Sequence, residues 1–221
     1  MSNRRDARGD DPFGGRRPTS HERAAGRPWN ASYADGPAPW DTGAPQPAVV
    51  RLVADGVFSG TVLDAGCGTG ENALCVAALG IPVLGVDVAE TALAMARAKS
   101  EQRALAAEFA WADALRLDRL DRTFDTVLDC GLFHTFDRTE RAEYLTSLAA
   151  VSAARTMLYL LCLSDQGSAT GPHPVAREEL SAAFDLAEGW RVVGIEPDRI
   201  RTRFHDENGA PAWLATVERA T

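Results

Sequence analysis

A glycine-rich corner with an aspartate at its entrance is the first feature that could do chemistry. The corner reads DAGCGTG from Asp64 to Gly70, and it follows an apolar run at residues 61–63. Glycines allow a tight turn and let the backbone approach a ligand with no Cβ in the way. The Asp64 carboxylate suits an ammonium group, although a structural acid that accepts from loop amides would have the same sequence. The pattern predicts a ligand site between a strand and a helix.

Two further aspartates follow the next two apolar runs. Asp87 lies about 20 residues beyond Gly66, where an acid can accept hydrogen bonds from ribose hydroxyls. Its alternative role is the N-cap of the helix that follows. Asp113 ends the third run, where its carboxylate could accept from an adenine amino group or could be an ordinary turn acid.

These acids need a scaffold that brings strand ends together. Helical patterns alternate with apolar runs of strand length from residue 47 onward. We expect helices at residues 47–56, 71–80, 89–100, 138–153 and 175–184, and strands at residues 60–66, 81–88, 107–113, 124–131, 156–164, 190–200 and 211–220. This alternation predicts an α/β fold with a doubly wound, mostly parallel sheet. Ligands of such sheets bind at the carboxyl ends of the strands, where all three aspartates lie.

Glu71 narrows the choice of ligand. A nicotinamide dinucleotide site needs its third glycine at this position. A carboxylate at the helix N-terminus would also repel an anionic pyrophosphate, which argues against a dehydrogenase. The corner therefore fits a nucleoside that carries no pyrophosphate. Ammonium, ribose and adenine groups together describe S-adenosylmethionine.

Four segments resemble successive motifs of class I S-adenosylmethionine-dependent methyltransferases. They read VLDAGCGTGENAL, VLGVDVAETALAMARAK, WADALRL and FDTVLDCGLFHTF, and the resemblance covers most of residues 45–165. It implies a Rossmann-like, seven-stranded sheet whose last strand is antiparallel. It also implies S-adenosylmethionine as the cofactor and S-adenosylhomocysteine as its product.

A shorter resemblance concerns the kind of methyltransferase. PWDTGAPQPAVVRL at residues 39–52 and GPHPVAREEL at residues 171–180 are similar to segments of thiopurine, thiol and halide methyltransferases. The glycine corner is closer to that of bacterial quinone and heterocycle methyltransferases. In the first group the early Trp-Asp pair lies against the cofactor, which implies the same for Trp40 and Asp41. The cofactor contacts that we expect are Trp40, Asp64, Gly66, Cys67, Gly68, Gly70, Asp87, Val88, Asp113, Ala114 and Asp129.

The residues after the fourth expected strand should face the transferred methyl group. His134 is the group there that ordinarily titrates near neutral pH, so it is our candidate general base. It could instead cap a helix or bond a backbone carbonyl. Phe133 and Phe136 either wall an aromatic acceptor or belong to the core. Tyr33 and His173 are further candidates for substrate contact, with a plain surface role as the alternative for His173.

The sequence-based hypothesis is a small-molecule methyltransferase. Its acceptor would be an O, N or S atom of a compact, aromatic or heterocyclic compound, in natural-product tailoring or detoxification. The alternatives are a thiol or halide methyltransferase that needs no general base, and a non-catalytic module that keeps the nucleoside pocket. A general base is needed only where the acceptor holds a proton at the working pH.

Composition limits the partners. The chain has 221 residues and a formal charge of −8, while residues 1–28 alone hold seven Arg and four acids. An acidic body argues against nucleic-acid binding. No apolar run has the roughly 20 residues that a membrane helix needs, so we expect a cytoplasmic protein without membrane contact. The cysteines form no CxxC pair, and we expect no metal site. The oligomeric state stays open.

The first residues differ in composition from the rest. Residues 1–28 are rich in Arg, Gly, Asp and Pro and hold few apolar side chains. Such a segment buries too little surface to offset its ordering entropy. We therefore expect a disordered arm at residues 1–28 and one catalytic domain at residues 29–221.

Overall fold

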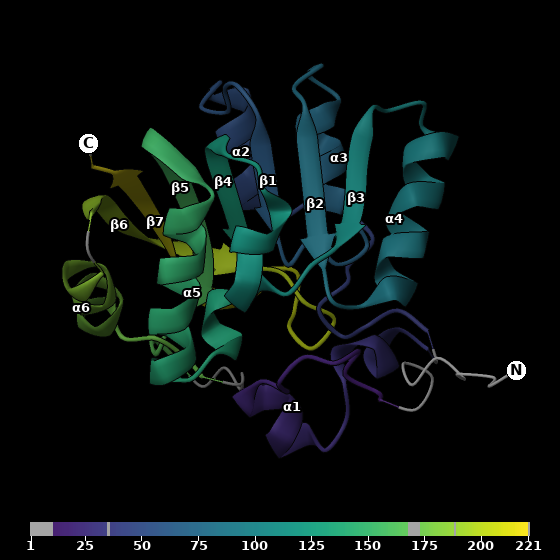
Figure 1. Cartoon of the computed structure of the whole chain (residues 1–221), viewed down its shortest axis with the longest axis horizontal. Coiled ribbons are helices and arrows are strands. Elements are labelled where there is room, and N and C mark those ends of the chain that lie inside the picture. Colours follow the sequence, from purple (N-terminus) through teal and green to yellow (C-terminus); the bar gives the residue numbers. More distant parts are fainter. Residues whose placement is uncertain (1–10, 35, 168–172, 188, 221) are drawn as a thin grey trace, which may run out of the picture.

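One seven-stranded sheet organises the computed structural model, which describes residues 11–34, 36–167, 173–187 and 189–220. The spatial order of the strands is β3-β2-β1-β4-β5-β7-β6 (Figure 1). The strands are β1 (Val62–Ala65), β2 (Val83–Asp87), β3 (Ala107–Trp111), β4 (Phe124–Cys130), β5 (Ser152–Leu163), β6 (Trp190–Ile200) and β7 (Ala210–Arg219).

Strand direction follows the predicted pattern. β1 pairs in parallel with β2 on one side and with β4 on the other. β7 runs antiparallel to both β5 and β6. The predicted α/β sheet with an antiparallel last strand is therefore confirmed. Because the chain turns back from β3 to β4, the strand order reverses at β1 and β4, which is where ligands bind in such sheets.

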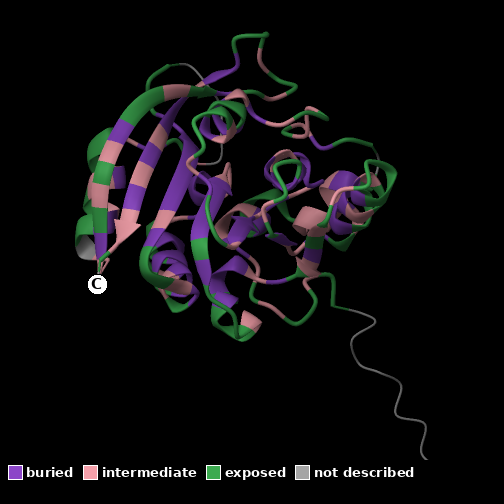
Figure 2. Cartoon of the chain, turned by 90° about the horizontal axis from the view of Figure 1, so that it is seen from above, coloured by how far each residue is buried: buried purple, intermediate pink, exposed green. Residues whose placement is uncertain are grey.

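Helices cover both faces of the sheet. Their inward apolar side chains form two core clusters, one around Leu74 and Leu93 and the other around Leu145 and Phe184. The buried positions lie along the strands and on the inner faces of the helices (Figure 2). The helices are α2 (Pro47–Ala54), α3 (Glu71–Ala77) and α4 (Glu90–Gln102) beside the first cluster, and α5 (Arg138–Ala150) and α6 (Arg177–Leu186) beside the second. Among the described residues, no helix is both long and apolar enough to cross a bilayer.

The N-terminal segment corrects the prediction of a disordered arm. Residues 1–10 lie outside the described residues, but α1 (Ser20–Ala25) is a helix with a capping box between Thr19 and Glu22. The Glu22 side chain is 1% exposed and also accepts from Trp29 N–H at 2.9 Å. The prediction is wrong for this part because it counted the charges as solvated, whereas they satisfy one another and neighbouring backbone groups.

Three short 3₁₀ helices were not predicted from the sequence. They are η1 (Trp29–Tyr33), η2 (Ala114–Leu120) and η3 (Phe133–Thr135). η1 precedes α2, η2 follows β3 and η3 follows β4. Each contains residues that line the cavity described below.

Gly70 gives a test of this packing. It begins α3 with φ +82°, and a Cβ there would lie 2.8 Å from both Ala96 Cβ and Phe109 Cζ. Gly70→Ala should lower the free energy of unfolding by about 2–5 kcal/mol, through backbone strain and overpacking. Gly80→Ala is the control, because Gly80 also has a positive φ but open space around it, and it should cost about 1–2 kcal/mol. Urea unfolding of both variants measures the difference, and equal losses would contradict the packing.

Candidate active site

A cavity of about 500 Å³ opens at the carboxyl ends of the central strands. The cavity is lined by the strand-end loops, by residues of the N-terminal segment, by residues 29–46 before α2, and by residues 200–205 at the end of β6 and after it. Figure 1 shows the N-terminal segment, drawn in purple, running across these strand ends. The volume lies within the range of pockets that enclose a small molecule.

Asp87 connects two sides of the cavity floor. Its Oδ2 accepts from Gly68 N–H at 2.9 Å, and its Oδ1 accepts from Ala89 N–H at 2.8 Å. Burial raises the pKa of Asp87, and the backbone hydrogen bonds oppose that rise. Each oxygen keeps a lone pair for a further donor. The carboxylate therefore holds the glycine corner and can still accept from ribose hydroxyls.

Asp113 lies at the next strand end and lines the same cavity. It caps η2 by accepting from Leu115 N–H at 3.0 Å, so it also has the structural role of a turn acid that was the alternative prediction. Val88 and Ala114 line the cavity beside it, as do Gly66, Cys67 and Gly68 of the glycine corner.

Asp64 corrects the prediction of an ammonium contact. Its side chain is 1% exposed, does not line the cavity, and leaves Oδ2 with no hydrogen-bond partner among the described residues. Burial and the nearby Asp129 carboxylate raise the pKa of Asp64 to about 7. Asp64 lies inside β1, opposite Gly85 of β2, and so deeper in the sheet than the strand-end residues that line the cavity.

Asp129 is also a structural residue rather than a cofactor contact. It is fully buried, and its Oδ1 accepts from Leu132 N–H at 2.9 Å and from Phe133 N–H at 3.3 Å. Burial raises its pKa to about 7. These bonds fix the loop that carries His134. The expected contact from Gly70 is likewise absent from the cavity lining, because that glycine packs on Ala96 and Phe109.

The early Trp-Asp pair closes the side of the glycine corner. Trp40 Nε1 donates to Tyr33 Oη at 2.8 Å, and Asp41 Oδ2 accepts from Thr69 Oγ1 at 3.0 Å. A Cβ built on Gly68 would lie 3.2 Å from Tyr33 Oη. Tyr33 therefore lies beside the glycine corner, which places it against the expected cofactor rather than against the acceptor.

His134 lines the cavity but differs from the expected base. Its ring is 7% exposed, and burial lowers its pKa to about 3. Its Nδ1 accepts from Leu163 N–H at 3.2 Å, so the neutral ring carries its proton on Nε2. The expectation that it titrates near neutral pH is wrong, because the surroundings exclude water. His134 is a hydrogen-bond donor at neutral pH.

Of the remaining residues predicted to contact the acceptor, one lines the cavity and two do not. Phe136 lines the cavity. Phe133 does not, because it is fully buried, stacks on the Phe184 ring and contacts the Arg141 guanidinium. For Phe133 the core alternative therefore holds and the acceptor wall does not. His173 also does not line the cavity, and its carbonyl accepts from Arg141. Residues 168–172 of its loop lie outside the described residues.

Several cavity residues were missed because they belong to the segment predicted to be disordered or to a hairpin loop. The first group is Arg16, Thr19 and His21, and the second spans residues 200–205. Trp29, the first residue of the predicted domain, also lines the cavity. The Gln46 side chain joins the two walls, since it exchanges two 2.8 Å hydrogen bonds with the Arg201 backbone. No sequence signal pointed to the hairpin loop, but the aromatic Trp29 and the Thr19–Glu22 spacing indicated order in the N-terminal segment.

Comparison with known proteins gives the family. Residues 62–154 match a methyltransferase domain family. The chain is 34% identical over 167 residues to the 2-heptyl-1-hydroxyquinolin-4(1H)-one methyltransferase of Mycobacteroides abscessus, covering 73% of this chain and 72% of that protein. The chain belongs to the class I S-adenosylmethionine-dependent methyltransferases.

Two solved structures agree with this assignment. This methyltransferase is 38% identical to a protein solved in connection with the conversion of a disulfide bond into a thioacetal group during echinomycin biosynthesis, with a TM-score of 0.76 over 83% of this chain and 86% of that one. Magnesium protoporphyrin IX methyltransferase from Synechocystis PCC 6803, solved with bound S-adenosylmethionine, shares the fold at 22% identity, with a TM-score of 0.61 over 78% of this chain and 76% of that one.

The cavity of this methyltransferase fits the cofactor. Gly68 leaves room where a side chain would meet Tyr33, and Asp87 and Asp113 present carboxylate oxygens toward the cavity. Lys99 and Arg103 are both engaged by Glu71, at 2.9 and 2.8 Å, rather than directed at a phosphate. Carboxylates for hydroxyl and amino donors suit an adenosine without phosphates.

Asp87 gives a direct test of the cofactor half. Asp87→Ala should raise the dissociation constant of S-adenosylhomocysteine about 10- to 100-fold, since it removes hydrogen bonds to a charged acceptor. The control is Asp118→Ala, at an exposed ion pair with Arg116 outside the cavity, which should bind as the wild type does. Isothermal calorimetry measures both, and an unchanged affinity for Asp87→Ala would exclude the assigned role.

Asp64 gives a prediction about pH. Its pKa rises from 3.8 to about 7 on folding, so the folded state binds the proton more tightly and loses stability as the pH rises through that window. Asp64→Asn removes this ionisation. At pH 8 it should be more stable than the wild type by about 1 kcal/mol or more, with a smaller gain at pH 5. Urea unfolding at both pH values checks this, and a variant that is less stable at pH 8 would contradict it.

Proposed function

We propose that this methyltransferase transfers a methyl group to an O, N or S atom of a small aromatic or heterocyclic acceptor. The observation that carries the proposal is the neutral imidazole of His134, which lines the cavity together with the apolar Leu132, Phe136 and Leu163. A flat, mostly apolar ring with one hydrogen-bond acceptor fits such a surface.

The chain has to bind and orient the cofactor and the acceptor, and it has to exclude water from the cavity. S-adenosylmethionine, when bound, supplies an electrophilic methyl group on a sulfonium. Asp87 and Asp113 would hold the adenosine, and Tyr33 and Trp40 would cover it. The His134 Nε2–H would donate to an oxygen of the acceptor and so fix its orientation. Orientation of two reactants in a closed cavity supplies much of the acceleration of a displacement reaction.

A hydroxylated heterocycle is the acceptor class that we favour. The relative from Mycobacteroides abscessus is named for a hydroxyquinolone, and it shares a third of its residues over most of this chain. An oxygen on a flat bicyclic ring would match the donor on His134 and the apolar wall around it.

A sulfur acceptor is the second candidate. One similar structure was solved in connection with the conversion of a disulfide bond into a thioacetal group during echinomycin biosynthesis. The His134 Nδ1 already accepts from Leu163 N–H and Nε2 carries the proton, and the pKa of the ring is low, so we do not expect His134 to serve as a base. A thiolate needs no base, so this observation favours it.

An acceptor screen tests the proposal. Purified protein with S-adenosylmethionine would be given 2-heptyl-1-hydroxyquinolin-4(1H)-one, 4-hydroxyquinoline, thiophenol and an aliphatic thiol, with S-adenosylhomocysteine and methylated product measured by mass spectrometry. We expect turnover of at least one aromatic acceptor and little of the aliphatic thiol. Tight binding of S-adenosylhomocysteine with no turnover of any aromatic acceptor would instead support a non-catalytic module.

His134 gives the sharper prediction. His134→Ala should lower kcat/KM for a hydroxylated heterocycle about 10- to 100-fold, the value of a lost hydrogen bond to a charged or polarised oxygen. Because the ring is neutral above about pH 4, the shape of the pH profile should not change. Affinity for S-adenosylhomocysteine serves as the folding control. Loss of one limb of the pH profile in the variant would show that His134 titrates during the reaction.

A further inference from the structure

The N-terminal segment carries a second histidine into the cavity. His21 lies on α1 and lines the cavity together with Arg16, Thr19 and Trp29. Its ring stacks on Trp29, with centroids 4.5 Å apart and planes 15° apart. Trp29 meets Trp40 edge to face at 5.4 Å, and Trp40 bonds Tyr33 beside the glycine corner. An aromatic wall therefore runs from the cofactor side of the cavity to His21.

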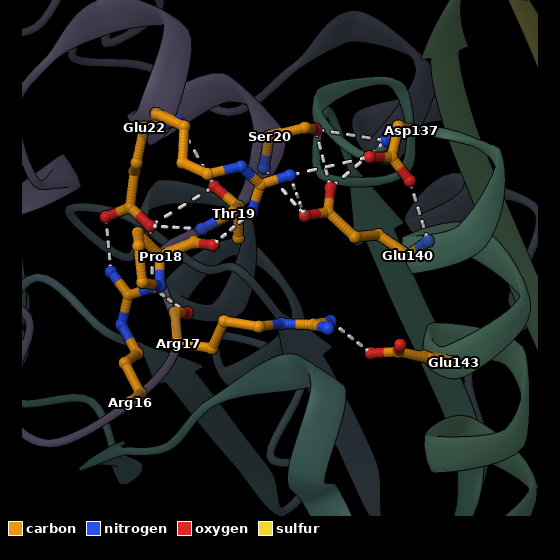
Figure 3. Close-up of polar contacts among 10 residues, drawn as sticks. Arg16, Arg17, Pro18, Thr19, Ser20, Glu22, Asp137, Glu140 and Glu143 are labelled. Atoms are coloured by element: carbon orange, nitrogen blue, oxygen red, sulfur yellow. Dashed lines mark hydrogen bonds and ion pairs between the residues drawn. The ribbon is translucent and has the colours of Figure 1, made fainter.

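Ion pairs and hydrogen bonds to a buried carboxylate hold this segment in place. Ser20 N–H and Ser20 Oγ donate to the two oxygens of Glu140 on α5, each at 2.6 Å. The Glu140 side chain is 2% exposed and also accepts from Asp137 N–H. Figure 3 shows this contact beside the Arg17–Glu143 and Arg16–Glu22 pairs. His21, the neighbour of Ser20, is thus positioned by the fold.

Other cavity groups are engaged or do not titrate in a useful range. The His134 ring is neutral with a low pKa, and its Nδ1 accepts from Leu163 N–H. Burial raises the pKa of Tyr33, so it stays protonated. The His205 Nδ1 lies 2.7 Å from Thr202 Oγ1, and Asp41 accepts from Thr69. Among the described residues, the ring nitrogens of His21 have no hydrogen-bond partner, and the exposure of this residue is intermediate.

We propose that His21 is the residue that accepts the proton of an O–H or N–H acceptor in this methyltransferase. The inference rests on the proposed function and names its missing base. The acceptor's O–H or N–H bond breaks, its electron pair stays on the acceptor atom, and the proton binds an unpartnered ring nitrogen of His21. The electron pair left behind is the nucleophile for the methyl group. The imidazolium then returns its proton to water.

The electrostatic surroundings favour the neutral, proton-accepting ring. Burial lowers the pKa of His21 below 6.5, His173 and Arg27 lower it further, and Glu22 opposes them. His21 in turn lowers the pKa of His134. Activity toward an O–H or N–H acceptor should therefore fall as the pH drops through the His21 pKa, because the ring is then already protonated.

His21→Phe is the test variant. Phenylalanine keeps an aromatic ring against Trp29 but has no nitrogen. With 4-hydroxyquinoline, kcat/KM should fall about 10²-fold or more and the acidic limb of the pH profile should disappear. With thiophenol, which ionises without help, the rate should change by less than about threefold, as should the affinity for S-adenosylhomocysteine. His173→Phe is the control for a nearby histidine that does not line the cavity: kcat/KM at the pH optimum should hold, and the acidic limb should remain, moved slightly to higher pH because His173 lowers the pKa of His21.

Ring NMR gives a readout that needs no turnover. In protein saturated with S-adenosylhomocysteine, 4-hydroxyquinoline should shift the His21 ring resonances and not those of His173. Equal losses with both acceptors, weakened S-adenosylhomocysteine binding or an unshifted His21 ring would overturn the proposal. If wild-type protein turns over neither acceptor, the proposed function fails, while the NMR shift still decides whether His21 faces the ligand.

Discussion

The hydrogen bond from Gly68 N–H to the Asp87 carboxylate is the constraint on which the site depends. It joins the glycine corner after β1 to the end of β2, and it fixes the bare backbone that forms the cavity floor. Gly66, Gly68 and Gly70 all have positive φ, so the corner needs residues that adopt this conformation without strain. Tyr33 and Trp40 then cover the corner from the other side. The cofactor half of the site is thus built by backbone geometry and a carboxylate rather than by a cationic pocket.

Much of the fold could be predicted, because hydrophobic periodicity and the glycines that end helices depend on local structure. The strand ends also located Asp87 and Asp113 correctly at the cavity. The same pattern gave a wrong prediction for Asp64, since an acid at a strand end has the same sequence pattern whether its side chain faces a cavity or is buried beneath it. The register of β1 and β2 makes the difference: Asp64 pairs with Gly85 inside the sheet, whereas Asp87 lies beyond Val86, the partner of the last β1 residue. Sequence spacing does not record that register.

The N-terminal segment shows the second limit of sequence reasoning. Its composition indicates a solvated arm, but its order comes from pairs that are far apart in the chain, such as Ser20 with Glu140. Such contacts leave no local pattern. This limit also affects the choice of catalytic residue. The predicted base, His134, is buried and stays neutral, whereas His21, which also lines the cavity, lies in the segment predicted to be disordered. Residue type pointed to His134, and the sequence does not record the burial that lowers the pKa of this ring to about 3.

The central claim is that this cavity holds an adenosyl amino acid without phosphates. Calorimetric titration of the wild-type protein with S-adenosylhomocysteine, and separately with NADH, tests it most directly. The account predicts saturable binding of one S-adenosylhomocysteine per chain and no heat of binding for NADH. Binding of NADH, or no binding of S-adenosylhomocysteine at millimolar concentration, would contradict it.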